Sequence, residues 1–328
     1  MATTITTSLI QTAEALSEQD TRISSIILFI LNKVFPPAVI VGGLIGNLLI
    51  YLVLKQPQYA KQTTCFFMRT LAICDSCSLG HIIIRTMVFY HPGYMLFKSG
   101  KYVCPIMAFF TGVYGLSNWT TTAMTFDRFL AVRYPLKVAS WCTMKRCRIC
   151  LVCIYISGIA ILIPYSFRSV KPGAMVLKEI CRFDPNIFPL WFHGTIHLIQ
   201  SFGLFTTPFC LILIFNMSII ATLIQEKIRK RGSMMATSGG KPKDSHITVL
   251  LLLVTSVFFV TNIPWTLDQL IWNPNQVLSP RMAMIRQVTY EVEVLLLVLN
   301  PSVNFYTYCL GCRKFRNDVK AMFSKVVK

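Results

Sequence analysis

The chain has 328 residues, of which 54% are hydrophobic and only 14% are charged, and its formal net charge is +19. This composition excludes a soluble globular domain, because a soluble fold of this length needs a larger polar surface. The charge does not indicate a nucleic-acid partner, because the basic residues lie in the gaps between apolar runs instead of on one soluble face.

Seven apolar segments are each long enough to cross a bilayer, and charged residues flank them. They predict an all-α membrane protein in which seven transmembrane helices form a bundle. A helix on the membrane surface is expected after the last span, because apolar residues recur there at helical spacing. In chain order, the predicted spans and the surface helix are Ile26–Leu54, Thr63–Tyr90, Val103–Val132, Cys147–Tyr165, Leu190–Ile224, Ile247–Trp272, Ile285–Leu310 and Arg313–Val327.

The chain is therefore expected to comprise an outer N-terminal tail over residues 1–25, the bundle over residues 26–310, and the surface helix with a short tail over residues 311–328. The segments after the first, third and fifth spans, together with the C-terminal segment, carry roughly twice as many Lys and Arg residues as the opposite side. The positive-inside rule then predicts an extracellular N-terminus and a cytoplasmic C-terminus.

Polar residues inside the predicted spans need partners, because lipid offers none. If their helices adjoin, four of them could hydrogen-bond across the core and leave room for a small cation such as sodium. These residues are Asn47, Asp75, Ser117 and Asn304. No other metal site is expected. The regularly spaced Cys147, Cys150 and Cys153 lie on a predicted lipid-embedded helix, where Cys behaves as a small apolar residue.

Of the 12 cysteines, Cys104 and Cys181 are the only two predicted to face the oxidising outer side of the membrane. A disulfide between them would tie the loop between spans four and five across the mouth of the bundle, and the alternative is two free thiols. Cys309 and Cys312, at the junction with the surface helix, are candidate palmitoylation sites.

An acidic and a basic residue, Asp127 and Arg128, stand side by side at the predicted cytoplasmic end of the third span. Charged residues near membrane depth are usually paired and functional, so this couple is either an anchor at the membrane surface or a switch. Three prolines, Pro164, Pro208 and Pro264, are expected to kink spans four, five and six and to free backbone carbonyls inside the bundle.

In their joint order, these motifs make the chain resemble the rhodopsin-like (class A) G-protein-coupled receptors over all seven spans and the surface helix. The sequence from Asn304 onward is most similar to invertebrate neuropeptide receptors, including FMRFamide-type receptors. The resemblance rests on Asn47, Leu71–Asp75, Cys104, Asp127–Phe129, Pro208, Phe258, Pro264, Asn304–Tyr308 and Phe315.

The resemblance implies a plasma-membrane receptor, not an enzyme, that binds an extracellular ligand and activates a heterotrimeric G protein. It also implies a resting ion pair between Arg128 and Asp244, which stands just before span six. The residues expected to act as the activation switch are Asp127, Arg128, Asp244, Phe258, Asn262, Pro264, Asn304 and Tyr308.

Several positions depart from the pattern of this family. Asn262 stands where the family usually has a tryptophan, and Phe305 replaces the usual proline of the last motif. Ile154 or Tyr155 falls where span four usually has a tryptophan. These departures mark a divergent branch of the family.

Phe110 stands where an amine receptor of this family would carry an aspartate, and Val298 stands where an opsin carries its retinal-binding lysine. Neither an amine receptor nor an opsin is therefore expected. The predicted outer cavity combines aromatic side chains with charges of both signs, which suits a short peptide. The residues expected to line it are Arg85, Phe110, Tyr114, Gln200, Trp265, Asp268, Gln269, Glu291 and Glu293.

The acidic residues Asp268, Glu291 and Glu293 could hold a basic side chain of such a peptide. Alternatively, Arg85 pairs with Glu291 inside the protein, and the ligand is then a lipid or a small polar chemosensory molecule. A membrane transporter is the remote alternative. It would need a polar path through the bundle, whereas the polar residues of this sequence cluster at the predicted outer mouth and inner hub with Phe and Leu between them.

Overall fold

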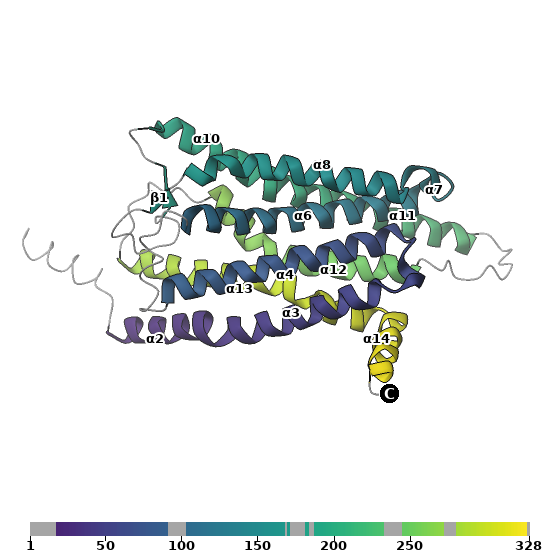
Figure 1. Ribbon diagram of the computed structural model, residues 1–328, viewed down its shortest axis with the longest axis horizontal. Helices are drawn as coiled ribbons and strands as arrows, with labels where there is room; N and C mark the ends of the chain where they lie inside the picture. Colours follow the sequence, from purple (N-terminus) through teal and green to yellow (C-terminus); the bar gives the residue numbers. More distant parts are fainter. Residues whose placement is uncertain are drawn as a thin grey trace, which may run out of the picture.

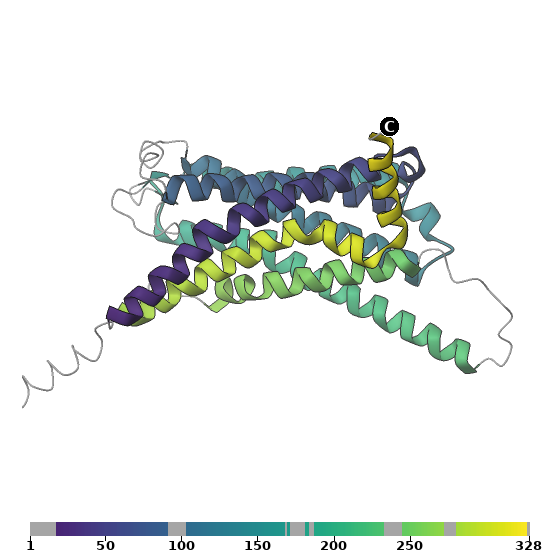
Figure 2. The same ribbon diagram turned by 90° about the horizontal axis from the view of Figure 1, so that it is seen from below.

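The computed structural model describes residues 18–90, 103–167, 169–170, 181–183, 187–232, 245–271 and 280–326. In this part of the chain, long helices run side by side as a bundle, and α14 (Arg313–Val326) lies across one end (Figures 1 and 2). The predicted all-α membrane bundle is confirmed. A small addition is the antiparallel pairing of β1 (Ser169–Val170) with β2 (Cys181–Arg182).

Each predicted span corresponds to one helix or to a continuous series of helical segments. The first span is α2 (Glu18–Phe29), the π-helix η1 (Ile30–Val34) and α3 (Phe35–Leu54), so it begins within the predicted tail. The next three are α4 (Thr63–Tyr90), α6 (Val103–Arg133) and α8 (Met144–Leu162) with η4 (Ile163–Phe167). The last three are α10 (Leu190–Gln200) with the π-helix η5 (Ser201–Thr206) and α11 (Thr207–Gly232), then α12 (Ser245–Ile271) and α13 (Pro280–Gly311).

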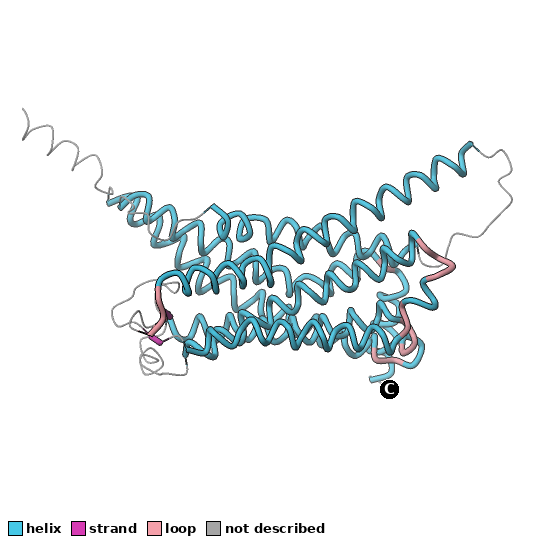
Figure 3. The backbone as a smooth tube through the Cα atoms, turned by 90° about the horizontal axis from the view of Figure 1, so that it is seen from above, coloured by secondary structure: helices cyan, strands magenta, loops and turns pink. Residues whose placement is uncertain are grey.

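Two short helices, η2 (Pro57–Tyr59) and α7 (Val138–Trp141), lie in the connections after the first and third spans. The C-terminal part of α11 projects beyond the neighbouring helices at the end of the bundle that carries α14 (Figures 2 and 3). This end is the predicted cytoplasmic side.

Among the described residues, four helices are long and apolar enough to cross a membrane by length and composition: Phe35–Leu54, Gly194–Arg229, Leu250–Asp268 and Met284–Gly311. α6 does not belong to this set, although it is 31 residues long. The bundle hides its polar side chains: Asp127 is 2% exposed and Thr120 is fully buried. The lower apolar content of α6 therefore reflects inward-facing polar residues.

Pro208 explains the irregular turn in the fifth span. Proline has no backbone N–H, so the carbonyl four residues earlier, at Leu204, loses its helical donor. The side chain of Asn118 in α6 donates to that carbonyl at 3.4 Å, and Trp119 Nε1 donates to the Gly203 carbonyl at 2.8 Å. The irregular backbone is thereby satisfied inside the bundle, as a membrane span requires.

α3 comes close to α13 and α4 at Gly43. A Cβ added there would lie 2.5 Å from the hydroxyl oxygen of Ser302 and 2.8 Å from Leu79 Cδ1. Leu79 is fully buried, so it has no open space into which it could move. Residue 43 must therefore lack a side chain.

We expect Gly43→Ala to lower the melting temperature of the purified protein, because overpacking costs about 1–3 kcal/mol. The matched control is Gly194→Ala in α10, where an added Cβ would meet nothing within 4 Å. Equal melting temperatures for the two variants, measured by thermal unfolding in detergent, would contradict this packing.

Candidate functional site

A polar cluster forms around Asp75 in the middle of the bundle. The carboxylate of Asp75 is 1% exposed and accepts hydrogen bonds from Ser117 Oγ at 2.6 Å and from Asn304 Nδ2 at 2.7 Å. Asn47 of α3 donates to the carbonyl of Pro301, three residues before Asn304, at 3.0 Å. The four residues predicted as a polar core therefore lie on adjoining faces of α3, α4, α6 and α13.

The oxygen atoms of this cluster fit a small, hard cation. Asn47 Oδ1 is buried and has no hydrogen-bond partner within the described residues, so it is a free acceptor. Carboxylate, hydroxyl and amide oxygens are the ligands that hard cations prefer. In the described ranges, no group of three or more His, Cys, Asp and Glu side chains is placed to hold a metal ion. The cluster, with its one carboxylate, suits a monovalent ion such as sodium.

Asp127 holds Arg128 near the C-terminal end of α6. Arg128 donates to Asp127 Oδ2 from Nε at 3.2 Å and from Nη2 at 2.8 Å. Thr63 and Thr64 of α4 donate to the same carboxylate at 2.9 Å and 2.8 Å. The side chains of Arg128 and Asp127 are only 11% and 3% exposed, so the pair lies inside the bundle and not at its surface, and its role as a switch stays a prediction. Asp244, the second predicted partner, lies outside the described residues.

Tyr114 links the predicted ligand cavity directly to the predicted switch. Its hydroxyl donates to Asn262 Oδ1 at 2.9 Å, and Asn262 Nδ2 donates to the Phe258 carbonyl at 2.8 Å. The ring of Tyr114 also stacks on Phe205 of η5, with ring centroids 6.1 Å apart. The asparagine that replaces the usual tryptophan therefore joins α6 to α12 by a hydrogen bond.

An ion cluster joins α12 and α13 at the end of the bundle away from α14. Arg286 Nη2 lies 2.7 Å from each carboxylate oxygen of Asp268, and Arg286 Nη1 lies 3.8 Å from Glu293 Oε1. Arg286 is absent from the predicted set of lining residues. The sequence does hold a signal for this contact, because residues seven apart, such as Arg286 and Glu293, share a helix face.

An aromatic pair lies next to this ion cluster. Trp265 of α12 and Tyr290 of α13 have ring centroids 6.1 Å apart, and Trp265 Nε1 is buried without an acceptor among the described residues. The other predicted lining residues are Phe110 and Gln200, which are half-buried, Glu291, which is buried, and Arg85 and Gln269, whose side chains lie outside the described residues.

Cys104, near the N-terminal end of α6, is disulfide-bonded, whereas ten other cysteines are free thiols. The predicted partner, Cys181, lies in β2, and its side chain is outside the described residues. The pairing of these two residues stays a prediction. Cys309 and Cys312 are half-buried free thiols near the start of α14, and their palmitoylation also stays a prediction.

Span four usually carries a tryptophan in this family, and here either Ile154 or Tyr155 falls at that position. Of the two, Tyr155 makes the polar contacts with neighbouring helices. Its hydroxyl oxygen lies 2.8 Å from Thr120 Oγ1 and 3.2 Å from Cys74 Sγ. The phenol thus ties α8 to α6 and α4, a role that the side chain of Ile154 could not perform.

The surface helix α14 is held against the connection after the first span. Tyr59 of η2 donates a hydrogen bond to the carboxylate of Asp318, and Lys314 Nζ lies 4.9 Å from the centroid of the Tyr59 ring. Burial and the neighbouring carboxylate raise the pKa of Tyr59, so the phenol remains a donor. Phe315 is 4% exposed and packs edge-on against Tyr308, with centroids 5.8 Å apart.

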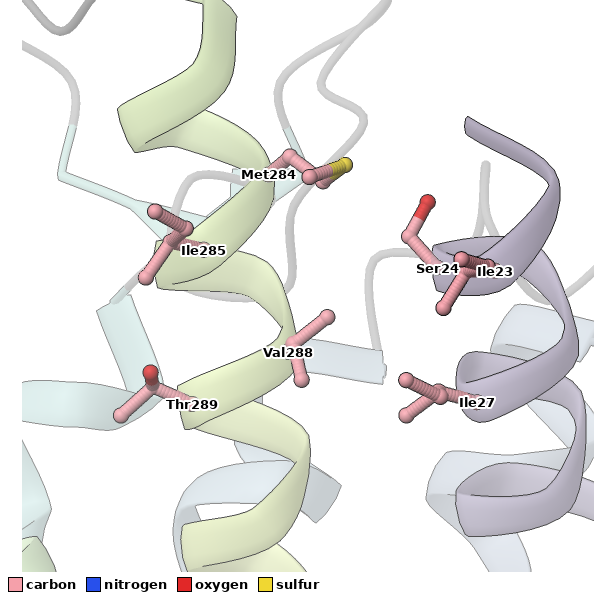
Figure 4. A pocket seen from close by; sticks show the side chains of 7 residues that line it. All are labelled: Ile23, Ser24, Ile27, Met284, Ile285, Val288 and Thr289. Atoms are coloured by element: carbon pink, nitrogen blue, oxygen red, sulfur yellow. The ribbon is translucent and has the colours of Figure 1, made fainter. Parts of the chain in front are cut away.

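Two shallow apolar grooves lie between the first and seventh spans. One, of about 220 Å³, separates α2 from α13, and Figure 4 shows Ile27 and Val288 facing each other across it. The other, of about 280 Å³, lies between α3 and α13. None of the predicted ligand-lining residues contributes to either groove, and their apolar walls suit contact with membrane lipid.

Comparison with known proteins places these features in context. The family model described as 7 transmembrane receptor (rhodopsin family) matches residues 46–308. The sex peptide receptor of Drosophila melanogaster is 24% identical over 321 residues, which cover 88% of this chain and 71% of that protein. The human neuromedin-U receptor 2 is 24% identical over 90% of this chain and 71% of its own length. The human cysteinyl leukotriene receptor 1 is 25% identical over 70% of this chain and 66% of its own length.

We expect Tyr155→Phe to lower the melting temperature by about 2–4 °C, because it removes a hydroxyl whose contacts with α6 and α4 are worth about 1 kcal/mol. Tyr306→Phe is the matched control, since Tyr306 is 50% exposed. The interhelical role of Tyr155 would be contradicted if both substitutions changed the melting temperature equally.

Proposed function

Because the chain belongs to the rhodopsin family of seven-transmembrane receptors, we propose that its ligand is an extracellular peptide and that its intracellular partner is a heterotrimeric G protein. Membership of this family makes the chain a G-protein-coupled receptor and a multi-pass protein of the plasma membrane. The family is one of receptors rather than enzymes. In this proposal the N-terminus is extracellular and the C-terminus is cytoplasmic, following the distribution of Lys and Arg.

The observation that carries the peptide proposal is the combination of charges and aromatic rings between α12 and α13. Asp268, Arg286 and Glu293 supply both signs of charge, and Trp265 with Tyr290 supplies an apolar surface beside them. A peptide presents the same mixture of charged, aromatic and amide groups. The names of two similar proteins, the sex peptide receptor and the neuromedin-U receptor 2, agree with this ligand class.

A lipid ligand is the second candidate, and it has specific support. The human cysteinyl leukotriene receptor 1 is 25% identical to this chain. The two grooves beside the first and seventh spans are also lined mostly by apolar side chains. Those grooves contain no ion pair, however, so they offer little to hold a charged head group.

The proposed mechanism is a shift between two populations of the receptor. In the resting population, Asp127 holds Arg128, and Tyr114 holds Asn262. A ligand beside Trp265 and Tyr114 would weaken the contact between α6 and α12. Movement of α12 about Pro264 would then open the inner end of the bundle and release Arg128 toward the G protein.

The proposal includes a sodium ion at the polar core in the resting population. Asp75, Ser117 and Asn304 would hold the ion, and the free amide oxygen of Asn47 lies in the same cluster. The bound cation would neutralise the buried Asp75 carboxylate. The ion would thereby stabilise the four helices that meet there.

The function is tested by GTP exchange on an added G protein, using membranes that contain the receptor and pools of amidated peptides or lipid mediators. We expect a peptide pool to stimulate exchange, and we expect Arg128→Ala to reduce that stimulation about tenfold or more, as loss of a charge-assisted contact predicts. Arg133→Ala is the control, because Arg133 is exposed on the same helix. Full stimulation in Arg128→Ala at equal surface expression, or stimulation by the lipid pool alone, would count against the proposal.

The sodium site predicts a cation-specific stabilisation. For a dissociation constant of about 10 mM, replacing choline chloride by sodium chloride at about 150 mM should raise the melting temperature by about 3–6 °C. Asp75→Asn should abolish this difference, whereas Asp268→Asn, at the other ion cluster, should retain it. A sodium response that persists unchanged in Asp75→Asn would remove the site from the proposal.

A further inference from the structure

Within the described residues, the guanidinium of Arg286 contacts two carboxylates between the adjoining ends of α12 and α13. Arg286 contacts Asp268 at 2.7 Å and Glu293 at 3.8 Å. The side chains of Asp268, Glu293 and Arg286 are 9%, 4% and 18% exposed, so all three charges are largely withdrawn from solvent. Because a buried carboxylate without a cation is costly, this position in the structure requires a positive group.

The two contacts of Arg286 differ in strength. The distance to Asp268 is that of a short, charge-assisted hydrogen bond, whereas the distance to Glu293 exceeds hydrogen-bond length. Glu293 is therefore the carboxylate that Arg286 holds less firmly. A second guanidinium could bind Glu293 through two parallel hydrogen bonds, the geometry that carboxylates favour. An anion would instead be repelled by the carboxylates of Asp268 and Glu293.

The neighbouring groups suit the rest of a peptide residue. Arg286, Tyr290 and Glu293 are four and three residues apart, so they share one face of α13, and Trp265 shares a face of α12 with Asp268. The rings of Trp265 and Tyr290 lie 6.1 Å apart. Trp265 Nε1 is buried and finds no acceptor in the described ranges, so it could donate to a peptide carbonyl.

From this geometry we propose that Arg286 is an internal occupant of the cationic subsite and that the guanidinium of an arginine in the peptide ligand replaces it. The inference rests on the proposed function, a peptide receptor whose ligand enters at the outer end of the bundle. Replacement breaks the ion pair between α12 and α13. The outer end of α12, beyond Pro264, is then free to move, so Arg286 determines both the charge of the ligand and the resting position of the helix.

The subsite is tested without any natural ligand by chemical complementation of Arg286→Ala. Purified receptor in lipid nanodiscs is titrated with ethylguanidinium, and the neutral ethylurea serves as the matched probe. At about ten times a millimolar dissociation constant, ethylguanidinium should raise the melting temperature of Arg286→Ala by about 3–5 °C. Wild type and the triple variant Arg286→Ala/Asp268→Asn/Glu293→Gln should not respond.

A second measurement covers the case in which Arg286→Ala does not fold. Each pool of amidated peptides is synthesised with arginine and again with neutral citrulline, and both are assayed for GTP exchange on the wild type and on Arg286→Gln. We expect the arginine pool alone to act on the wild type, and we expect Arg286→Gln to respond at about tenfold lower concentration. Arg281→Gln is the control, because Arg281 is exposed five residues earlier on α13.

Three results would overturn the inference: equal responses to ethylguanidinium and ethylurea, equal activity of the citrulline pool, or an unchanged effective concentration in Arg286→Gln. The peptide-receptor function would survive each of them if peptides still stimulate exchange. Conversely, a guanidinium-specific shift without any peptide-stimulated exchange would support the cation site and refute the proposal of a peptide ligand on which the inference rests.

Discussion

Polar side chains inside a membrane bundle must satisfy one another, because lipid supplies neither donors nor acceptors. In this protein, α6 carries most of these contacts, and they reach four different neighbours. Ser117 bonds to α4, Tyr114 to α12, Thr120 to α8, and Asn118 and Trp119 to η5. The polar residues of α6 therefore determine which helices surround it, and the apolar faces of those helices are left for lipid.

The sequence was sufficient for the helices and for the polar core, because span length and interior polarity can be read along one segment. Asp75, Ser117 and Asn304 meet as their positions predicted. The contact of Arg286 with Asp268, and that of Tyr59 with Asp318, depend on which helix ends adjoin and on side-chain direction. Neither the adjacency of helix ends nor the direction of a side chain can be predicted from one segment of sequence. The same limit applies to Tyr155, whose partners lie on two other helices.

Two departures from the family pattern are compensated locally. Phe305 replaces the usual proline, yet α13 contains Pro301 one helical turn earlier, and Asn47 donates to its carbonyl. Asn262 replaces the usual tryptophan and forms a hydrogen bond with Tyr114 where a ring would have packed. The first change moves the proline of α13 by one turn and adds a polar contact to its carbonyl, and the second replaces a ring with a directed polar contact. Such contacts depend on angle as well as distance, so they favour discrete helix positions over continuous ones.

The π-helical segments η1 and η5 change the direction in which side chains point along the first and fifth spans. In a regular helix, one additional residue turns every later side chain by about 100°. A π-helical turn absorbs that residue within a single wide turn. The face that α10 turns toward the bundle is therefore not fixed by the face of α11, because η5 lies between them. The same holds for α2 and α3, which η1 separates. The N-terminal halves of the first and fifth spans can thus vary in sequence register while their C-terminal halves keep the same faces toward the core.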